Sequence, residues 1–317
     1  MTENQSSKGA SLQGIYLILL STIVFTVMDG FVKWTADSYP VIQLLFFRCV
    51  FALIPITLIL WKTGNFRHLK TAQPFKHILR GCVGMLAMFF VFTSYTVLPL
   101  ADVVTILFAA PLLTTVLAIP ILGERIGLHR AIAIIVGFIG VLIVVQPGSG
   151  LLSSAVLYPI AAATCMACAM LTVRVLGRTD HGAVISFYFT LFGIVVACVG
   201  LAFEGWVMPR GIDWALLIAI GLLGGLGQYF LTSAYAIAEV AVISPFKYTA
   251  LIWAAGIAYF IWGEVPAWQT WLGAGVIVFS SLYMLHREVY WANKDKPNQD
   301  RRFARIKSRV MVFLQRG

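Results

Sequence analysis

The chain has 317 residues, of which 60% are hydrophobic and only 11% are charged, and its mean hydropathy is +0.89. A water-soluble domain has about 25% charged residues, so this composition excludes an ordinary soluble protein and indicates a membrane protein. The formal net charge of +10 would suit a nucleic-acid ligand, but the basic residues lie in the gaps between apolar runs, where membrane topology accounts for them. We therefore expect no nucleic-acid partner.

The apolar runs are about 18 to 22 residues long, which is the length that a helix needs to cross a hydrocarbon core about 30 Å thick. They are far too long for the strands of a membrane barrel. We therefore predict an all-α membrane protein with about ten transmembrane helices. These helices are expected near residues 14–34, 41–61, 78–97, 103–122, 130–146, 155–175, 184–203, 214–237, 242–262 and 269–286.

An internal repeat divides these helices into two sets. Residues 101–124 return as residues 241–264, 140 positions later and without a gap, and both stretches end in a Gly-Glu pair. Because each set has five helices, an odd number, the second set must enter the membrane from the opposite side, which predicts two inverted-topology repeats. We expect four units: an N-terminal tail (1–11), a first repeat (12–148), a second repeat (149–288) and a basic tail (289–317).

The distribution of Lys and Arg predicts the orientation. The connections 62–77, 123–130 and 174–182 are basic, whereas the alternate connections contain Arg210 as their only basic residue. Basic loops stay in the cytoplasm, so both termini are expected there. Within the tail, residues 301–314 have the pattern of an amphipathic helix that would lie on the lipids of the inner leaflet, with a disordered basic tail as the alternative.

Ionisable residues within the spans are the candidates for function, because each is costly unless it is paired or hydrated. Asp29 and Arg48 are each expected roughly 8–10 Å below the outer surface, at a rise of about 1.5 Å per residue. Two interpretations stay open: a structural ion pair between them, or a substrate-binding or proton-coupling role for one of them. Lys33, one turn from Asp29, either extends to the surface or competes for the same carboxylate.

Lys247 is the other buried cation, about five residues inside the ninth predicted helix and next to Pro245. Proline removes a helical hydrogen bond, and such breaks are tolerated in membranes where they face a cavity or another helix. Lys247 is therefore either a cavity residue that binds substrate or a lysine that extends to the surface. The polar residues expected near it are Gln228, Tyr235, Ser244 and Tyr248. The aromatic residues that either stack on a ligand or anchor helices at the interface are Trp34, Tyr95, Trp253 and Tyr259.

The sequence shows no paired carboxylates, activated nucleophile, metal-ligand spacing or phosphate-binding loop. The five histidines all fall in predicted cytoplasmic loops or at cytoplasmic helix ends, without metal-binding spacing. We therefore expect a protein that is not an enzyme and that holds no cofactor and no metal.

Two five-helix halves that each close the fourth helix with Gly-Glu resemble the EamA branch of the drug/metabolite transporter superfamily, over residues 12 to about 288. Shorter motifs resemble the bacterial subgroup that includes S-adenosylmethionine and riboflavin uptake carriers. These motifs are Met-Asp-Gly-Phe-Val-Lys at 28–33, Phe-Phe-Arg at 46–48, His-Ile-Leu-Arg-Gly at 77–81, Pro-Phe-Lys-Tyr at 245–248 and Leu-His-Arg-Glu at 285–288. Amino-acid exporters share the architecture, so the motifs indicate the fold more than the cargo.

The resemblance implies a central cavity lined by helices one to four and six to nine, with helices five and ten peripheral, and alternating access by rocking of the halves. It implies a secondary transporter of the bacterial inner membrane for a small polar-aromatic metabolite, such as an amino acid, S-adenosylmethionine or a riboflavin-like compound. The alternative is a membrane receptor or assembly partner on the same scaffold that moves no solute. The sequence leaves open whether the protein forms a homodimer.

Overall fold

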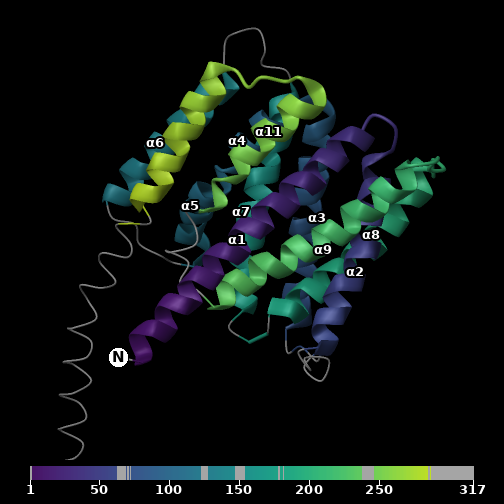
Figure 1. Cartoon of the computed structure of the whole chain (residues 1–317), viewed down its shortest axis with the longest axis horizontal. Helices are drawn as coiled ribbons and strands as arrows, with labels where there is room; N and C mark the ends of the chain where they lie inside the picture. The colour runs from purple at the N-terminus through teal and green to yellow at the C-terminus, as the bar shows by residue number, and fades with distance from the viewer. Residues whose placement is uncertain are drawn as a thin grey trace, which may run out of the picture.

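The computed structural model is a bundle of helices (Figure 1). It describes residues 2–62, 69, 71, 73–122, 128–146, 154–177, 179–180, 182–237, 246–284 and 286, with their side chains from residue 12 onward except at 122, 130, 154, 174, 232 and 235–237. Every regular element in these residues is helical. Six helices are long and apolar enough to cross a membrane, and three shorter apolar helices accompany them. The predicted class, an all-helical membrane protein, is therefore confirmed.

The helices follow the predicted order along the chain. They are α1 (Thr2–Thr35), α2 (Val41–Lys62), α3 (Pro74–Val97), α4 (Leu100–Leu107), α5 (Ala110–Leu122), α6 (Leu128–Val145), α7 (Leu157–Leu176), α8 (Gly182–Glu204), α9 (Asp213–Ile237) and α11 (Ala250–Trp262), and residues 268–284 form a further helix. The first of these begins well before the predicted residue 14, because a helix that is already nucleated adds one hydrogen bond for each residue that joins it. The basic tail after residue 286 lies outside the described residues.

The prediction of one continuous helix over 103–122 is wrong at its middle. The chain turns at residues 108–109, where the amide of Ala109 donates to the carbonyl of Ile106 at 2.9 Å. Pro111 has no N–H, so the carbonyl of Leu107 cannot receive the usual helical hydrogen bond. Together α4 and α5 still form one apolar stretch of spanning length, Leu100–Ile121, so the membrane is crossed by an interrupted helix.

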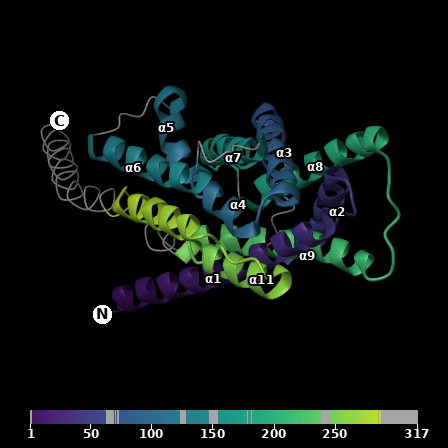
Figure 2. The same ribbon diagram turned by 90° about the horizontal axis from the view of Figure 1, so that it is seen from above.

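The largest cluster of buried apolar side chains draws on α1, α2, α3, α4, α8, α9 and α11. The closest pairings are α1 with α9, α2 with α9, α3 with α7 and α2 with α8. Figure 2 shows α6 and the 268–284 helix on one side of the molecule, away from α2 and α8. Small residues permit the tight α2–α9 contact: a Cβ atom on Gly221 would lie 2.5 Å from the carbonyl oxygen of Phe47, and one on Gly225 would lie 2.9 Å from that of Ala52. Small residues four positions apart on one helix permit such close packing of membrane helices.

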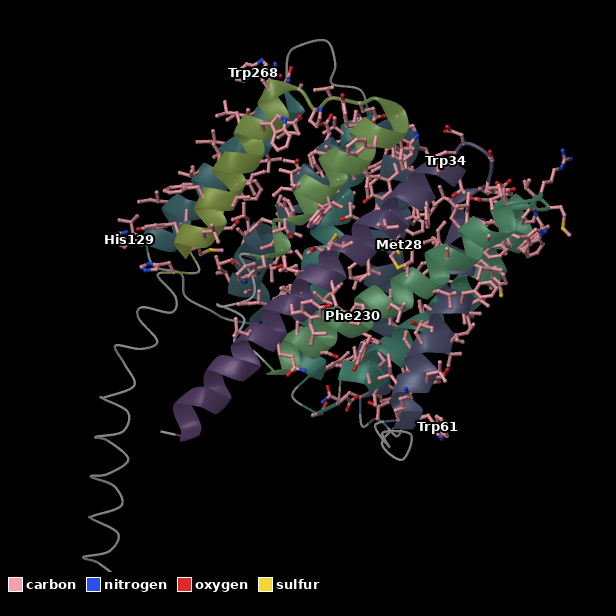
Figure 3. All side chains as sticks on the ribbon, viewed as in Figure 1. Met28, Trp34, Trp61, His129, Phe230 and Trp268 are labelled. Atoms are coloured by element: carbon pink, nitrogen blue, oxygen red, sulfur yellow. The ribbon has the colours of Figure 1, made fainter. Side chains whose placement is uncertain are left out.

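The bundle has two ends, which Figure 3 marks with Trp34 and Trp268 toward one edge and Trp61 toward the opposite edge. We name them by an acidic residue that lies at each. The Glu264 end carries the connections 36–40, 205–212 and 263–267, and the Asp180 end carries residues 69–73 and 177–180.

Candidate functional site

An ion pair joins the two halves of the chain at the Glu264 end. The ammonium of Lys33 on α1 lies 2.5 and 2.7 Å from the two carboxylate oxygens of Glu264, which follows α11. The same nitrogen lies 4.9 Å from the ring centroid of Trp262, within the range of a cation–π contact. Beside this pair, the hydroxyl of Thr270 donates to Asp102 at 2.7 Å.

Two further contacts, from Tyr39 before α2 and from Gln43 in its first turn, reach the chain before and at the start of α9. The Tyr39 hydroxyl donates to the Asp213 carboxylate at 2.6 Å. Burial, together with this donation to an anion, raises the pKa of Tyr39 above its ordinary value of 10.0. The amide of Gln43 donates to the carbonyl of Val207 and its oxygen accepts from the Val207 N–H, at 2.7 and 3.0 Å.

One carboxylate, that of Asp180, has two hydrogen-bond partners at the Asp180 end. A single oxygen of Asp180 lies 2.6 Å from His77 Nε2 and 2.6 Å from the hydroxyl of Thr71. The His77 and Asp180 side chains are only 5% and 7% exposed. The His77 ring also lies 4.8 Å from the ring of Tyr188, whose hydroxyl donates to the carbonyl of Leu69.

A weaker contact lies next to this cluster, where the amide of Gln73 donates to the hydroxyl of Thr179 at 3.0 Å. Burial alone would raise the pKa of Asp180. The hydrogen bonds from Thr71, His77 and Thr179 outweigh that effect, so the pKa of Asp180 lies below its ordinary value of 3.8.

Between the two ends, the interruptions of two helices meet. The turn at 248–249, just before α11, lies 140 positions after the turn at 108–109, and the Phe108 and Tyr248 rings contact edge-on with centroids 5.0 Å apart. The hydroxyl of Thr249 lies 3.2 Å from that of Thr22 on α1. Interrupted helices in transporters frequently contribute to substrate and ion sites, because their freed backbone groups need polar surroundings.

Asp29 and Arg48 lie in the interior, as their positions predict, but they do not form a direct ion pair. Among the described residues, the ion pairs within 4.0 Å are Lys33–Glu264 and His77–Asp180. Asp29 is partly buried and interacts with Arg48 over a longer distance, and its carboxylate lies near the Tyr95 hydroxyl, which is buried without completing a hydrogen bond. Lys33 forms its ion pair with Glu264, a partner that the sequence did not indicate.

Arg80 is an interior residue that was not among the functional residues predicted from the sequence. Its guanidinium carbon lies 4.2 Å from the ring centroid of Phe189, and that of Arg48 lies 5.8 Å from the same centroid. The helix that carries Arg80 begins at Pro74, whereas the sequence predicted that it begins at residue 78. The four extra residues place Arg80 roughly 9 Å along the helix instead of at its end.

The residues predicted to line a cavity fall into three groups. Lys247, Gln228 and Tyr248 are partly buried and all have contacts within the bundle. Trp253, Tyr259 and Trp34 are substantially exposed, at 39%, 56% and 54%, which favours the interface-anchor interpretation, whereas Tyr95 is 2% exposed. The side chain of Tyr235, together with Ser244 and Pro245, lies outside the described residues. Within the part of the chain that the structure describes, no three His, Cys, Asp or Glu side chains are grouped so as to hold a metal ion.

Interrupted apolar helices and buried charged side chains in one bundle define a class: multi-pass membrane proteins of the transporter type. The model of the EamA-like transporter family matches this chain twice, over residues 12–146 and 153–285. The chain belongs to the EamA-like transporter family.

Similar proteins within this class carry the names of transporters rather than of enzymes. The chain is 32% identical to a Rickettsia prowazekii S-adenosylmethionine uptake transporter, covering 87% of this chain and 94% of the relative. It is 29% identical to a Pseudomonas aeruginosa pseudopaline exporter (86% and 96%) and 26% identical to a Vibrio cholerae riboflavin transporter (92% and 99%). A solved crystal structure with 18% identity superposes with a TM-score of 0.62, covering 89% of this chain and 99% of the other, and thus shares the fold.

Proposed function

We propose that this protein is a secondary active transporter of the bacterial inner membrane that moves a small polar organic metabolite by alternating access. The observation that carries the proposal is the meeting of the two helix interruptions, Phe108 against Tyr248, in the interior of a bundle of this family. A membrane helix tolerates such a break where its backbone faces other protein groups or a wet cavity.

Contacts related by the 140-residue repeat support an inverted topology for the two halves. Tyr39 bonds to Asp213 at the Glu264 end, and their counterparts 140 positions away, Thr179 and Gln73, bond to each other at the Asp180 end. The pairing of α1 with α9 is likewise matched by that of α7 with α3. Equivalent contacts at opposite ends are expected when two repeats insert in opposite directions. In this proposal residues 12–148 and 149–288 are the two repeats of five helices each, and both termini are cytoplasmic.

The cargo class follows from the relatives and from the interior residues. The relatives are named for S-adenosylmethionine, pseudopaline and riboflavin, all small polar compounds. In the proposal, Asp29 and Arg48 provide charge of both signs, Lys247 and Tyr248 lie at the second helix interruption, and Gln228 on α9 adds an amide to the site. These groups suit a cargo with charged and ring-containing parts better than an apolar one.

Uptake into proteoliposomes tests the proposal. Purified protein should carry S-adenosylmethionine, riboflavin or an aromatic amino acid across the vesicle membrane faster than protein-free vesicles do. Specific binding of a panel member without flux would favour the receptor alternative over the transporter. Neither flux nor binding for any of the three classes would contradict both.

Lys247→Met tests whether this lysine belongs to the site. We expect the variant to retain its melting temperature and to lose at least about tenfold in flux, because a lysine used on the cargo cannot be replaced by a neutral side chain. Lys247→Arg should keep part of the activity. Normal transport by Lys247→Met would show that the lysine extends to the surface and that the site lies elsewhere.

A further inference from the structure

Two arginines share one aromatic ring in the interior of the bundle. Arg80 on α3 and Arg48 on α2 both lie against Phe189 on α8, at 4.2 and 5.8 Å from guanidinium carbon to ring centroid. Phe189 is 6% exposed and Arg48 is 5% exposed. A cation–π contact partly compensates a buried cation, but it supplies no hydrogen-bond acceptor.

Part of the hydrogen-bonding capacity of Arg80 is unused. Its Nε and Nη1 atoms are buried without a hydrogen-bond partner, and it takes part in neither of the ion pairs found in the described ranges. The charge that acts on it most clearly is that of Arg48, which has the same sign. Leaving an uncompensated guanidinium in a low-dielectric interior is strongly unfavourable, so a group that accepts from it is needed.

Asp29, the acid near the two arginines, forms no ion pair with Arg80. Asp29 interacts with Arg48 and with the Tyr95 hydroxyl. If both arginines and Asp29 are ionised, the three side chains have a net charge of +1. The cluster is therefore one negative charge short of neutrality.

The backbone around the arginines is shaped to hold them. A Cβ atom on Gly84 would collide with the Arg80 guanidinium and would lie 2.7 Å from the Phe189 ring. A Cβ atom on Gly224 would lie 3.2 Å from Arg48 Nε. On two helices, glycine thus leaves the space that the two guanidinium groups occupy.

We infer that Arg48 and Arg80 bind a carboxylate of the transported molecule, with Phe189 as the surface on which both guanidinium groups rest. The planar fork of N–H donors on arginine matches the two oxygens of a carboxylate. Asp29 then lies at the same site for a positive group of the same molecule, so the site takes a zwitterionic, amino-acid-like part of the cargo. This inference deepens the proposed transport function and rests on it for its role in transport.

Matched ligands that differ by one carboxylate test the assignment. The probes are S-adenosylmethionine and its decarboxylated form, and tryptophan and tryptamine. Binding to the full-length protein in detergent is measured from the ligand dependence of melting. We expect wild-type protein to bind at least one carboxylate form about tenfold or more tightly than its partner, and Arg80→Gln to lose that difference. Lys76→Gln is the control, because Lys76 is an exposed cation one turn before Arg80 on the same helix.

If Arg80→Gln does not fold, Arg80→Lys keeps the charge but lacks the planar fork, and should show a reduced preference for the carboxylate. Equal binding within both pairs by wild-type protein would overturn the inference, as would an unchanged preference in the Arg80 variants. Competition by inorganic phosphate without any carboxylate preference would overturn it too. Flux in proteoliposomes tests the transport function separately: carboxylate preference without flux contradicts the transporter, and flux without carboxylate preference contradicts the arginine site.

Discussion

The two ends of the bundle are held together in different ways. At the Glu264 end, three acids, Asp102, Asp213 and Glu264, each bind their own partner in the other half, and Gln43 and Val207 add a neutral contact. At the Asp180 end, one acid, Asp180, accepts from both Thr71 and His77, and the other described contacts, Gln73–Thr179 and Tyr188–Leu69, are neutral. No single substitution can remove the contacts of all three acids, whereas substitution of Asp180 removes both of its hydrogen bonds at once.

This difference bears on the proposed alternating access, in which each end would open in turn. The chain is symmetric enough for Tyr39–Asp213 and Thr179–Gln73 to occupy corresponding positions, yet the first bond has a charged acceptor and the second is neutral. Hydrogen bonds to charged groups are roughly twice as strong as neutral ones. We therefore expect the two ends to open at unequal cost, which would give the proposed pair of inverted repeats a preferred resting state.

Removing the shared acceptor should have the largest effect. Asp180→Ala leaves the His77 ring and the Thr71 hydroxyl without their acceptor in a buried place, and we expect it to cost about 3 kcal/mol of stability. Thermal unfolding in detergent measures this loss. Asp37→Ala, at an exposed acid of the opposite end, is the control and should change stability little.

The same carboxylate gives the Asp180 end a pH dependence. Because the folded-state pKa of Asp180 lies below its ordinary value of 3.8, its contribution is complete above that value and is lost as the pH falls through the folded-state pKa. Melting temperatures of wild-type protein should therefore drop more on acidification below about pH 4 than those of Asp180→Asn. Parallel curves for the two proteins would remove Asp180 as the cause.

Breaking the ion pair at the Glu264 end should have a smaller effect. The side chains of Lys33 and Glu264 are 10% and 32% exposed, so water compensates part of the loss. We expect Lys33→Met or Glu264→Gln to cost about 1–2 kcal/mol, and the double variant to cost less than the sum of the two. Strict additivity in this double-mutant cycle would mean that the pair contributes no coupling energy.

The smallest effect, and the sharpest contrast, should come from the hydrogen bonds related by the repeat. We expect Tyr39→Phe to cost about 1.5 kcal/mol, because it leaves a buried contact to a carboxylate unmade, and Gln73→Met to cost about 0.5 kcal/mol. Urea or thermal unfolding of the two variants under one condition gives the comparison. Equal costs would argue that the two ends are equally strong at these positions.

The sequence predicted the features that depend on local composition. Long apolar runs located the helices. The break at 108–109 could have been found, since Pro111 removes a hydrogen bond from the middle of the predicted span. A continuous helix was predicted because the run is uniformly apolar.

Features that depend on long-range pairing could not be predicted from the sequence. The partner of Lys33 is Glu264, 231 positions away, and nothing in the local pattern distinguishes that acid from Asp29, one turn away on the same helix. Arg80 is only the third residue of the helix predicted over 78–97, so its position there was that of a basic residue at a cytoplasmic helix end. Its interior position depends on where α3 begins and on the packing of Phe189 from α8 over it.

Locking each end separately tests the central claim, that solute crosses by alternate opening of the Glu264 and Asp180 ends. In a background without the five native cysteines, one protein carries Lys33→Cys with Glu264→Cys, and another carries His77→Cys with Asp180→Cys. A cleavable bifunctional thiol reagent joins each pair, and flux of the best-transported panel compound is measured before cross-linking, after it, and after cleavage. Uncross-linked protein of each kind provides the baseline. We predict that either cross-link alone stops flux and that cleavage restores it, whereas undiminished flux with either end locked would contradict alternating access through these two ends.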